Sequence, residues 1–307
     1  MTMNTNYDVL IIGGGPAGLS AGIYAARARL RTMLIEKAMF GGLIASAELV
    51  ENYPGFPEGI SGFDIGERMY QQASKFGLET LSAEVTSVDL LNDPKNIKTT
   101  EGDLSARAVI IASGAERKWL GVPGEDIFAN RGVSYCATCD GALFKDRVVA
   151  VVGGGDAAVE EAVFLTRFAS KVFIIHRRNQ LRASKTAQER ALSHKKIEPV
   201  WDTVVEEIKG SDKVSQLLVR NVKTGGTKEI AVDGVFVYVG QVPNTGYLKE
   251  QIPMDKEGFI ITDERMETQV KGVFAAGDIR KNSSRQVITA AGDGATAAIS
   301  AEKFLSS

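Results

Sequence analysis

The chain has 307 residues, of which 44% are hydrophobic and 24% charged, and its formal net charge is −2. This length suits two domains of ~100–200 residues each, and the composition is that of a globular protein. The basic residues are scattered, which argues against a nucleic-acid surface. No apolar run approaches the ~20 residues that a membrane span needs. The N-terminus is short and polar and lacks a secretory signal, so we expect a cytoplasmic protein.

The first predicted unit lies at the N-terminus. A short apolar strand, 7–12, runs directly into the glycine-rich segment 13–18 (GGGPAG). A helix over 19–28 follows, and then a second strand, 32–35, which ends at Glu36. Strand, glycine turn, helix and strand in this order predict a dinucleotide-binding βαβ unit.

Four residues of this unit have distinct physical roles. Gly13 permits the tight turn from strand to helix, and Gly15 lets the backbone approach a pyrophosphate. Gly18 allows the helix to pack closely on the strand, and the helix N-terminus supplies positive potential to phosphates. Glu36 stands where an acid accepts a hydrogen bond from a ribose hydroxyl. The alternative is a glycine turn that serves packing alone.

The same pattern occurs again in the middle of the chain. Strand 147–152 leads into the glycine-rich segment 153–158 (GGGDAA). A helix over 159–168 follows, and then a strand, 171–175, which ends at His176. The chain is therefore predicted to hold two nucleotide-binding units.

The second unit differs from the first at the end of its second strand. In place of an acid it carries His176, Arg177 and Arg178, with Arg182 four residues on. A carboxylate there would repel a ribose 2′-phosphate, whereas guanidinium groups bind phosphate bidentately. The second site is therefore predicted to prefer NADPH to NADH. The alternative is a solvated basic turn.

Two further segments indicate how the units are connected. A buried strand with a glycine turn is predicted over 108–115, and a similar pattern over 272–278 indicates a return of the chain to the first domain. Segments 116–124 and 240–246 are rich in turn-forming residues and are candidate hinges. The prediction is an α/β protein with two Rossmann-like, three-layer domains, the NADPH domain being inserted into the FAD domain. The predicted domain bounds are 1–116, 117–243 and 244–307.

The chain has only two cysteines, Cys136 and Cys139. Thiols at this spacing close a small disulfide ring, and in a reducing compartment such a pair is more often catalytic or metal-binding than structural. A zinc site needs about four ligands, and the only histidines are His176 and His194, so we expect no metal. A second alternative is an inert buried pair. Redox activity is the favoured interpretation.

Thiol chemistry also needs a proton donor near the sulfurs. Asp140 directly follows Cys139 and is the candidate acid. Its competing role is to cap the helix that follows. The residues alone leave these two roles open.

Six motifs occur in order: GGGPAG, VENYPGFP, CATCDG, GGGDAAVEEA, HRRNQLRAS and GVFAAGD. Together they closely resemble the low-molecular-weight thioredoxin reductase family, and the resemblance runs from Tyr7 to Phe304. CATCDG inside the second nucleotide-binding domain is the specific part, because other two-dinucleotide flavoproteins keep their redox cysteines elsewhere or lack them.

The resemblance implies FAD and NADPH as cofactors, a homodimer, and thioredoxin or a thioredoxin-like protein as partner. It implies that Cys139 faces the flavin, that Cys136 attacks the thioredoxin disulfide, and that the NADPH domain rotates about its two hinges. The predicted catalytic residues are Cys136, Cys139 and Asp140. The predicted FAD-binding residues are Gly13, Gly15, Pro16, Ala17, Gly18, Glu36, Gly41, Gly42, Leu43, Asn52, Ala112, Gly114, Gly277, Asp278, Arg285, Gln286, Val287 and Ala290. The predicted NADPH-binding residues are Gly153, Gly155, Asp156, Ala157, His176, Arg177, Arg178 and Arg182.

One residue departs from the family pattern. Members usually carry a glutamine after the glycine pair that is here Gly41 and Gly42, and this chain carries Leu43. The family's polar contact to the flavin from that side chain is therefore not carried over, and the flavin potential or the donor preference could differ.

Four rival functions compete with an NADPH-dependent disulfide reductase. The reductase of a peroxiredoxin system typically has an extra N-terminal disulfide domain, and here Tyr7 already begins the first strand. A relative driven by ferredoxin, or a dithiol oxidase that uses oxygen, should lack the basic residues Arg177 and Arg178. A flavin-binding sensor would not explain a dithiol beside an acid.

Overall fold

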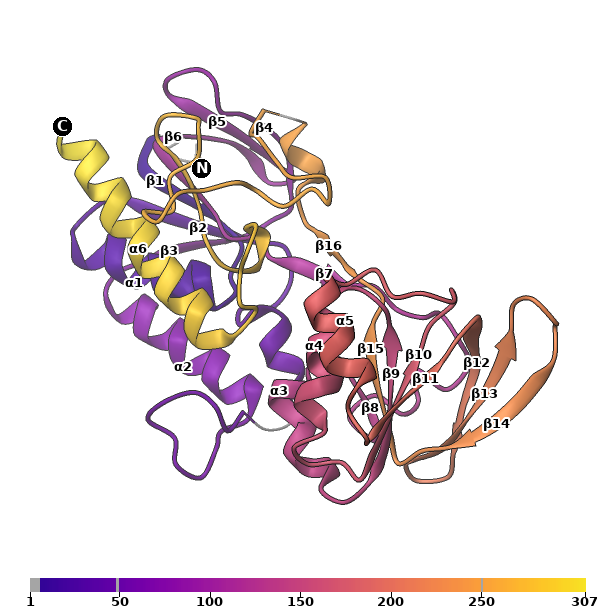
Figure 1. Cartoon of the computed structure of the whole chain (residues 1–307). Coiled ribbons are helices and arrows are strands. Elements are labelled where there is room, and N and C mark those ends of the chain that lie inside the picture. Colours follow the sequence, from indigo (N-terminus) through magenta and orange to yellow (C-terminus); the bar gives the residue numbers. More distant parts are fainter. Residues whose placement is uncertain (1–5, 48–49, 250) are drawn as a thin grey trace. The chain divides into compact units, whose positions relative to one another are not determined.

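The computed structural model describes residues 6–47, 50–249 and 251–307 (Figure 1). The chain divides into two compact units. The first is formed by the chain up to Glu116 together with Val242–Ser307, and the second by Arg117–Gln241. Over the described residues, no helix has the length and apolar character needed to cross a membrane.

The first unit is built on a seven-stranded sheet with the order β3-β2-β1-β6-β5-β4, in which β17 also pairs with β6. The strands β3, β2, β1, β6 and β17 run parallel, and the hairpin of β4 and β5 adds to β6 in antiparallel fashion. The strand bounds are β1 (Asn6–Ile12), β2 (Thr32–Glu36), β3 (Glu79–Ser82), β4 (Val85–Asp89), β5 (Lys95–Thr99), β6 (Gly102–Ile111) and β17 (Val273–Ala275).

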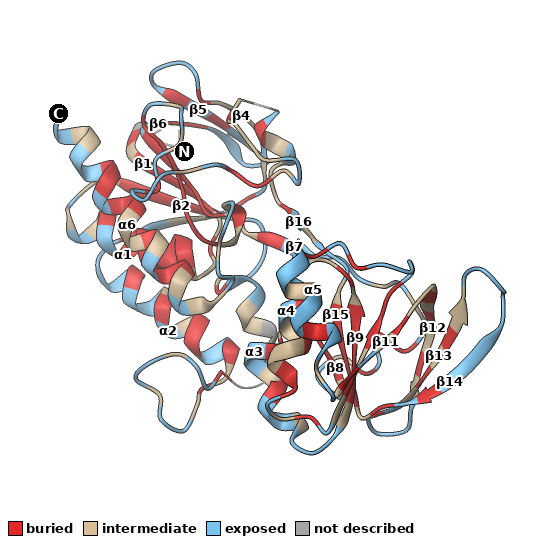
Figure 2. Cartoon of the chain, in the orientation of Figure 1, coloured by how far each residue is buried: buried red, intermediate tan, exposed pale blue. Residues whose placement is uncertain are grey.

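Both faces of this sheet are covered, which explains why its central strands are continuous apolar runs. Successive side chains of a strand point to opposite faces. Val9 and Ile11 therefore enter the core beneath the helices, whereas Leu10 and Ile12 enter a second core on the other face. Figure 2 shows these strands as buried along most of their length. The helices are α1 (Pro16–Arg27), α2 (Gly62–Lys75) and α6 (Val287–Ser306).

The second unit repeats this plan with a five-stranded parallel sheet of order β11-β10-β9-β15-β8. Its strands are β8 (Val133–Ser134), β9 (Val148–Gly153), β10 (Lys171–Ile175), β11 (Ile197–Val200) and β15 (Gly234–Tyr238). One face carries the helices α3 (Ala137–Asp140), α4 (Asp156–Leu165) and α5 (Lys185–Leu192). The other face carries an antiparallel sheet of β12 (Thr203–Gly210), β13 (Val214–Asn221) and β14 (Thr227–Ala231).

The chain passes between the units twice, through β7 (Ala115–Arg117) and β16 (Gln241–Pro243), which form a two-stranded sheet. β16 lies within the predicted hinge segment 240–246, and β7 overlaps the start of the segment 116–124. Their role as hinges stays a prediction. Four short 3-10 helices complete the described elements: η1 (Gly42–Ser46), η2 (Gly141–Phe144), η3 (Gly246–Leu248) and η4 (Gly277–Ile279).

The elements around the two glycine loops largely confirm the predictions. The strands β1, β2 and β10 lie where the apolar runs place them. The two helices begin about one turn earlier than predicted, and α1 starts with proline in its first turn, where the missing N–H costs nothing. The buried strand with a glycine turn predicted over 108–115 is confirmed, because β6 ends at Ile111 and the chain turns at Gly114, with φ +66°; β6 itself begins earlier, at Gly102.

Candidate active site and cofactor sites

The first glycine loop leaves no room for side chains where it turns. Gly13 has φ +109°, and a Cβ there would overlap the carbonyl of Ala112. A Cβ on Gly18 would overlap the carbonyl oxygen of Gly13. By contrast, the position of a Cβ on Gly15 has a single neighbour within 4 Å, the Gly42 Cα at 3.9 Å. The loop is therefore closed against its own strand and open at Gly15, as a backbone cradle for a pyrophosphate requires.

Glu36 lies under this loop at the end of β2. Its Oε2 accepts a hydrogen bond of 2.6 Å from the Gly14 N–H, and its Oε1 accepts one of 2.8 Å from the Ala38 N–H. Each carboxylate oxygen has a second lone pair. The side chain is thus held in place with acceptor capacity remaining for a ribose hydroxyl.

Several other residues predicted to bind FAD meet this loop at the carboxyl ends of the parallel strands. The Gly41 N–H donates to the Gly14 carbonyl at 2.8 Å. A Cβ on Gly277 would lie 2.9 Å from the Cβ of Ala17. This edge of the sheet is where open α/β folds bind their ligands.

The remaining predicted FAD residues are spread over the first unit. Pro16 begins α1, and Leu43, with 52% of its surface exposed, lies in η1. Asn52 donates through Nδ2 to the Gln286 Oε1 at 3.0 Å. Asp278 in η4 accepts from the Ser283 hydroxyl at 3.0 Å. The others lie after β6 or beside the start of α6: Ala112, Gly114, Arg285, Val287 and Ala290.

One polar pair that supports this site was not predicted from the sequence. The Asp293 Oδ2 accepts from the Gly277 N–H at 3.1 Å and from the Arg280 Nε at 2.9 Å. Both side chains are 14% exposed. The pair holds η4 against α6. Asp293 stands among small residues in the sequence, which was the only available signal.

The second glycine loop has the same form. Gly153 has φ +155°, and a Cβ there would lie 2.5 Å from the Tyr238 carbonyl oxygen and 2.7 Å from the Ala158 Cβ. A Cβ on Gly154 would lie 2.8 Å from the Cγ of His176, so the imidazole ring supports the loop directly. The Arg182 N–H donates to the Gly154 carbonyl at 2.6 Å.

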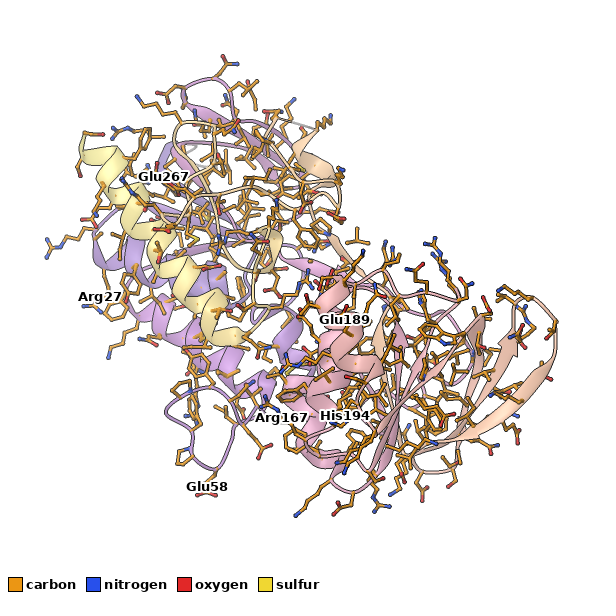
Figure 3. All side chains as sticks on the ribbon, viewed as in Figure 1. Arg27, Glu58, Arg167, Glu189, His194 and Glu267 are labelled. Carbon is orange, nitrogen blue, oxygen red and sulfur yellow. A yellow bond between two sulfur atoms is a disulfide. The ribbon has the colours of Figure 1, made fainter. Side chains whose placement is uncertain are left out.

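His176 is 5% exposed, and its ring hydrogen-bonds the backbone of Gln180. The buried Nε2 has no hydrogen-bond partner among the described residues. Burial, followed by the charges of the nearby arginines, lowers the pKa of His176. The ring is therefore neutral near pH 7 and brings no positive charge to the site. The other histidine, His194, lies beyond the end of α5 (Figure 3).

Positive charge at this loop comes from Arg177, Arg178 and Arg182, all three of them exposed. In the described part of the chain, none of the three takes part in an ion pair. Asp156 begins α4, and its Oδ1 accepts from the Ser184 N–H at 2.7 Å. The remaining residues of the predicted set, Gly155 and Ala157, lie at the start of the same helix.

The two cysteines form a disulfide across the start of α3. Cys136 is half-buried and Cys139 is exposed. The Sγ of Cys136 accepts a hydrogen bond of 3.2 Å from the Cys139 N–H. A backbone donor of this kind favours negative charge on that sulfur once the pair is reduced.

Asp140 is held by the Ser134 hydroxyl, which donates to its Oδ2 at 2.5 Å. It makes no side-chain hydrogen bond to the start of η2, so the alternative that Asp140 caps the following helix is wrong. Its carboxyl remains the nearest acid to the sulfurs in the sequence, and its role as proton donor stays a prediction.

A second acid, which the sequence did not single out, positions the segment before the cysteines. Glu125 is 2% exposed and accepts hydrogen bonds from the Leu120 N–H at 2.9 Å, the Gly121 N–H at 2.8 Å and the Tyr135 hydroxyl at 2.9 Å. Burial and this hydrogen bond raise the pKa of Tyr135. The anchor fixes the residue that directly precedes Cys136.

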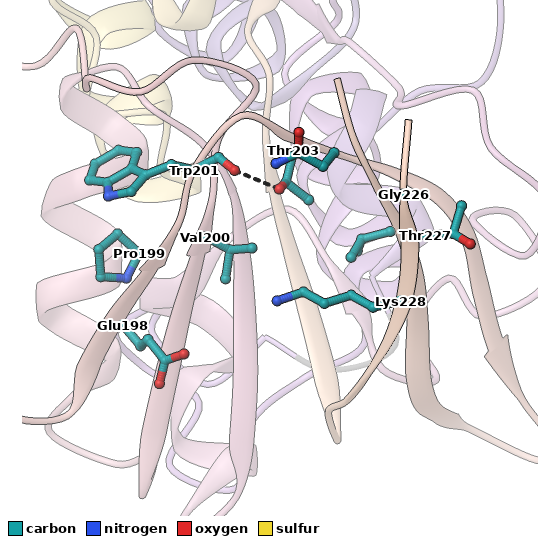
Figure 4. Close-up of a pocket in the computed structure, with 10 residues that line it drawn as sticks. Glu198, Pro199, Val200, Trp201, Thr203, Gly226, Thr227 and Lys228 are labelled. Atoms are coloured by element: carbon teal, nitrogen blue, oxygen red, sulfur yellow. Dashed lines mark hydrogen bonds between the residues drawn. The ribbon is translucent and has the colours of Figure 1, made fainter. Parts of the chain in front are cut away.

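A pocket of about 340 Å³ lies between β11, β12 and the hairpin of β13 and β14 (Figure 4). Its lining includes Trp201 and Lys228 and none of the predicted site residues. Within residues 6–47, 50–249 and 251–307, no group of three His, Cys, Asp or Glu side chains is placed to hold a metal ion.

Comparison with known proteins defines the class first. Residues 7–294 match the family model described as pyridine nucleotide-disulphide oxidoreductase. The chain belongs to this family, and within it to the low-molecular-weight thioredoxin reductases. It is 48% identical over 303 residues to the thioredoxin reductase of Treponema pallidum, covering 99% of this chain and 98% of the relative. Identity to the thioredoxin reductase of Bacillus subtilis is also 48%, over 97% of this chain and 95% of the relative.

Solved structures agree with this assignment. The crystal structure of thioredoxin reductase from Streptococcus pyogenes matches with a TM-score of 0.93 and 48% identity, covering 99% of each chain. Thioredoxin reductase from Giardia duodenalis matches with a TM-score of 0.95 and 39% identity, over 99% of this chain and 100% of that one. The prediction of two Rossmann-like domains is confirmed, and the enzyme is an oxidoreductase that uses FAD and NADPH.

Proposed function

We propose that the chain transfers electrons from NADPH, through FAD, to the Cys136–Cys139 disulfide and from there to thioredoxin or a thioredoxin-like protein. The observation that carries the proposal is the disulfide itself, formed by the chain's only two cysteines at the start of α3. When bound, the flavin accepts a hydride from NADPH and supplies two electrons to a disulfide.

The two glycine loops support an assignment of cofactors to units. Glu36 at the first loop suits the ribose hydroxyl of FAD, which carries no phosphate at that position. Arg177, Arg178 and Arg182 at the second loop suit the 2′-phosphate of NADPH. We therefore assign FAD to the first unit and NADPH to the second, with the residue sets predicted from the sequence.

The surroundings of the sulfurs support different roles for the two cysteines. The Cys139 N–H stabilises negative charge on the Cys136 sulfur, which favours Cys136 as the thiolate that attacks the disulfide of the partner. Cys139 then completes the exchange by attacking the mixed disulfide. Asp140, oriented by the Ser134 hydroxyl, provides a proton to the departing sulfur.

We further propose that the enzyme is a cytoplasmic homodimer. The relatives named above support a thioredoxin partner, and a reductase of this class serves a compartment whose protein thiols are kept reduced. Sedimentation analysis of the holoenzyme tests the dimer, and a monomer at micromolar concentration would contradict it.

The electron route is tested with Cys139→Ser. In this variant NADPH should still bleach the flavin absorbance, because the nucleotide sites are untouched, while NADPH-driven reduction of thioredoxin should fall to background. The bleaching serves as the internal control for folding and cofactor binding. Turnover of thioredoxin at the rate of the unmodified enzyme would refute the proposal, since the chain has no third sulfur of a cysteine to relay electrons.

A further inference from the structure

A glutamate with a buried carboxyl oxygen contacts the segment that carries the cysteines. Glu161 stands on α4 next to Glu160, and the two differ in environment: Glu160 is exposed, whereas the Oε2 of Glu161 is buried. This oxygen has no hydrogen-bond partner among the described residues. The carboxyl group is hydrogen-bonded by the side chain of Thr138, which lies between the two cysteines. A buried polar atom without a partner is uncommon in a folded protein and calls for an explanation.

The segment that carries the cysteines packs on this part of α4. Ala137 is fully buried in the same apolar cluster as Val159 and Ala162 of α4. The N–H of Ala137 donates to the hydroxyl of Tyr238 at 2.7 Å. Glu161 is thus hydrogen-bonded to Thr138, and the neighbouring Ala137 packs on the same helix, all within the second unit.

The charges around Glu161 are mostly negative or neutral. Glu160 lies on its own helix, and Tyr238 faces it from β15. The charges of Asp140 and Arg117 also act on Tyr238, the first raising and the second lowering its pKa. No ion pair of the described residues includes Glu161.

The pKa values of Glu161 and Tyr238 indicate that the charged groups here act on one another. Burial, and then the charge of Glu160, raise the pKa of Glu161. Burial, and then the charge of Glu161, raise the pKa of Tyr238. A new negative charge on a neighbouring sulfur would act on Glu161 in the same direction, because like charges disfavour each other's ionised forms.

We propose that Glu161 is a positioning residue of the dithiol, coupled to it by charge, and that it takes up a proton when the reduced pair forms its thiolate. Two electrons break the S–S bond; one sulfur takes a proton and becomes a thiol, the other remains a thiolate, and the Glu161 carboxylate takes a second proton. Oxidation of the pair by a partner disulfide releases both protons. The inference rests on the proposed function only for the source of the electrons.

Removing the charge of Glu161 should let the thiolate form at lower pH. A shift of one pKa unit corresponds to a tenfold change in the ionised fraction on the acid side of the titration. In Glu161→Gln we therefore expect the thiolate fraction at mildly acid pH to rise by about tenfold. A role confined to packing would not produce this change, since glutamine retains the shape of the side chain.

The test measures the rate of alkylation by iodoacetamide as a function of pH, because only the thiolate reacts. The FAD-loaded enzyme is reduced with dithiothreitol, freed of it without air, and alkylated between about pH 5 and pH 9, a range that brackets the ordinary thiol value. Modified cysteines are counted by mass spectrometry. Glu161→Gln should react about tenfold faster on the acid side, and the control Glu189→Gln, at an exposed position of α5 that does not act on Glu161, should follow the unmodified enzyme. A Glu161→Gln profile that coincides with that of the unmodified enzyme would overturn the coupling.

A second variant, Thr138→Val, keeps the proposal testable if Glu161→Gln does not fold. Thr138→Val removes the hydrogen bond that favours ionised Glu161, so its profile should shift in the same direction by a smaller amount. An unshifted or opposite profile in this variant would also count against the coupling. Alkylation needs neither NADPH nor thioredoxin. If the alkylation profile of Glu161→Gln shifts but the unmodified enzyme does not reduce thioredoxin, only the proposed electron route is refuted. If the unmodified enzyme reduces thioredoxin but the profile does not shift, only the role of Glu161 is refuted.

Discussion

The two glycine loops of this chain have the same backbone plan and opposite chemistry. In each, the strand ends in a glycine of positive φ, and the next glycine lies against the side chain that ends the neighbouring strand. That side chain is Glu36 in the first loop and His176 in the second, each 23 residues after the first glycine. Glu36 hydrogen-bonds its loop, whereas His176 supports its loop as a neutral ring.

The difference shows that turn geometry and nucleotide preference are separable. The backbone places one side chain beneath each loop, and the identity of the residues there sets the local charge. The first loop offers a carboxylate acceptor, and the second offers the guanidinium groups of the residues that follow His176. The same backbone geometry therefore suits two different cofactors, depending on the side chains beside it.

The loops also differ in how tightly helix and strand approach. Gly18 lies against the Gly13 carbonyl so closely that a methyl group does not fit, whereas the second loop accommodates Ala158 at the corresponding position. The first loop is therefore the more sensitive of the two to added volume.

The largest effect is expected from Gly18→Ala. The added methyl group would overlap a backbone carbonyl, so the loop must move, and the purified protein should lose most of its FAD. The ratio of flavin to protein absorbance after gel filtration measures this. The matched change Ala158→Gly should leave flavin content unchanged and cost only about 1 kcal/mol in helix propensity. FAD retention in Gly18→Ala equal to that in Ala158→Gly would contradict the expected disruption of the first loop.

An intermediate effect is expected from the double variant Arg177→Ala and Arg178→Ala. Loss of charge-assisted hydrogen bonds to a 2′-phosphate should raise the KM for NADPH by about ten- to a hundredfold and leave that for NADH nearly unchanged. Steady-state kinetics with both donors measure the selectivity. Arg190→Ala, in the exposed last turn of α5, is the control. A parallel loss with NADH would indicate a general defect of the site.

The smallest effect concerns the titration of His176. Because its folded pKa is lowered, the unfolded chain takes up the proton first, so the stabilising contribution is complete above about pH 6.5 and is lost as the pH falls toward the folded value. An NMR titration of the two histidines should show His176 changing below about pH 6.5. His194→Gln assigns the signals. Titration of His176 above this value would show that the ring carries charge at the loop.

Local patterns in the sequence predicted the parts of the molecule that depend on neighbouring residues. The βαβ units, their glycine turns and the paired cysteines were all readable, because a strand, a tight turn and a helix are specified within about thirty residues. The antiparallel hairpins of β4–β5 and β12–β14 were missed, since their short strands carry mixed polar and apolar residues that resemble loops.

Only the tertiary structure decided which distant side chains meet. Asn52 reaches Gln286, Asp293 supports Gly277, and Glu161 reaches Thr138 from another helix. Such contacts depend on the packing of helices and strands that are far apart in the chain, and no periodicity or spacing encodes them. The sequence by itself determined the class of enzyme and its redox pair. The fold determined the environment of that pair, because burial and the approach of neighbouring charges arise only when the chain is packed.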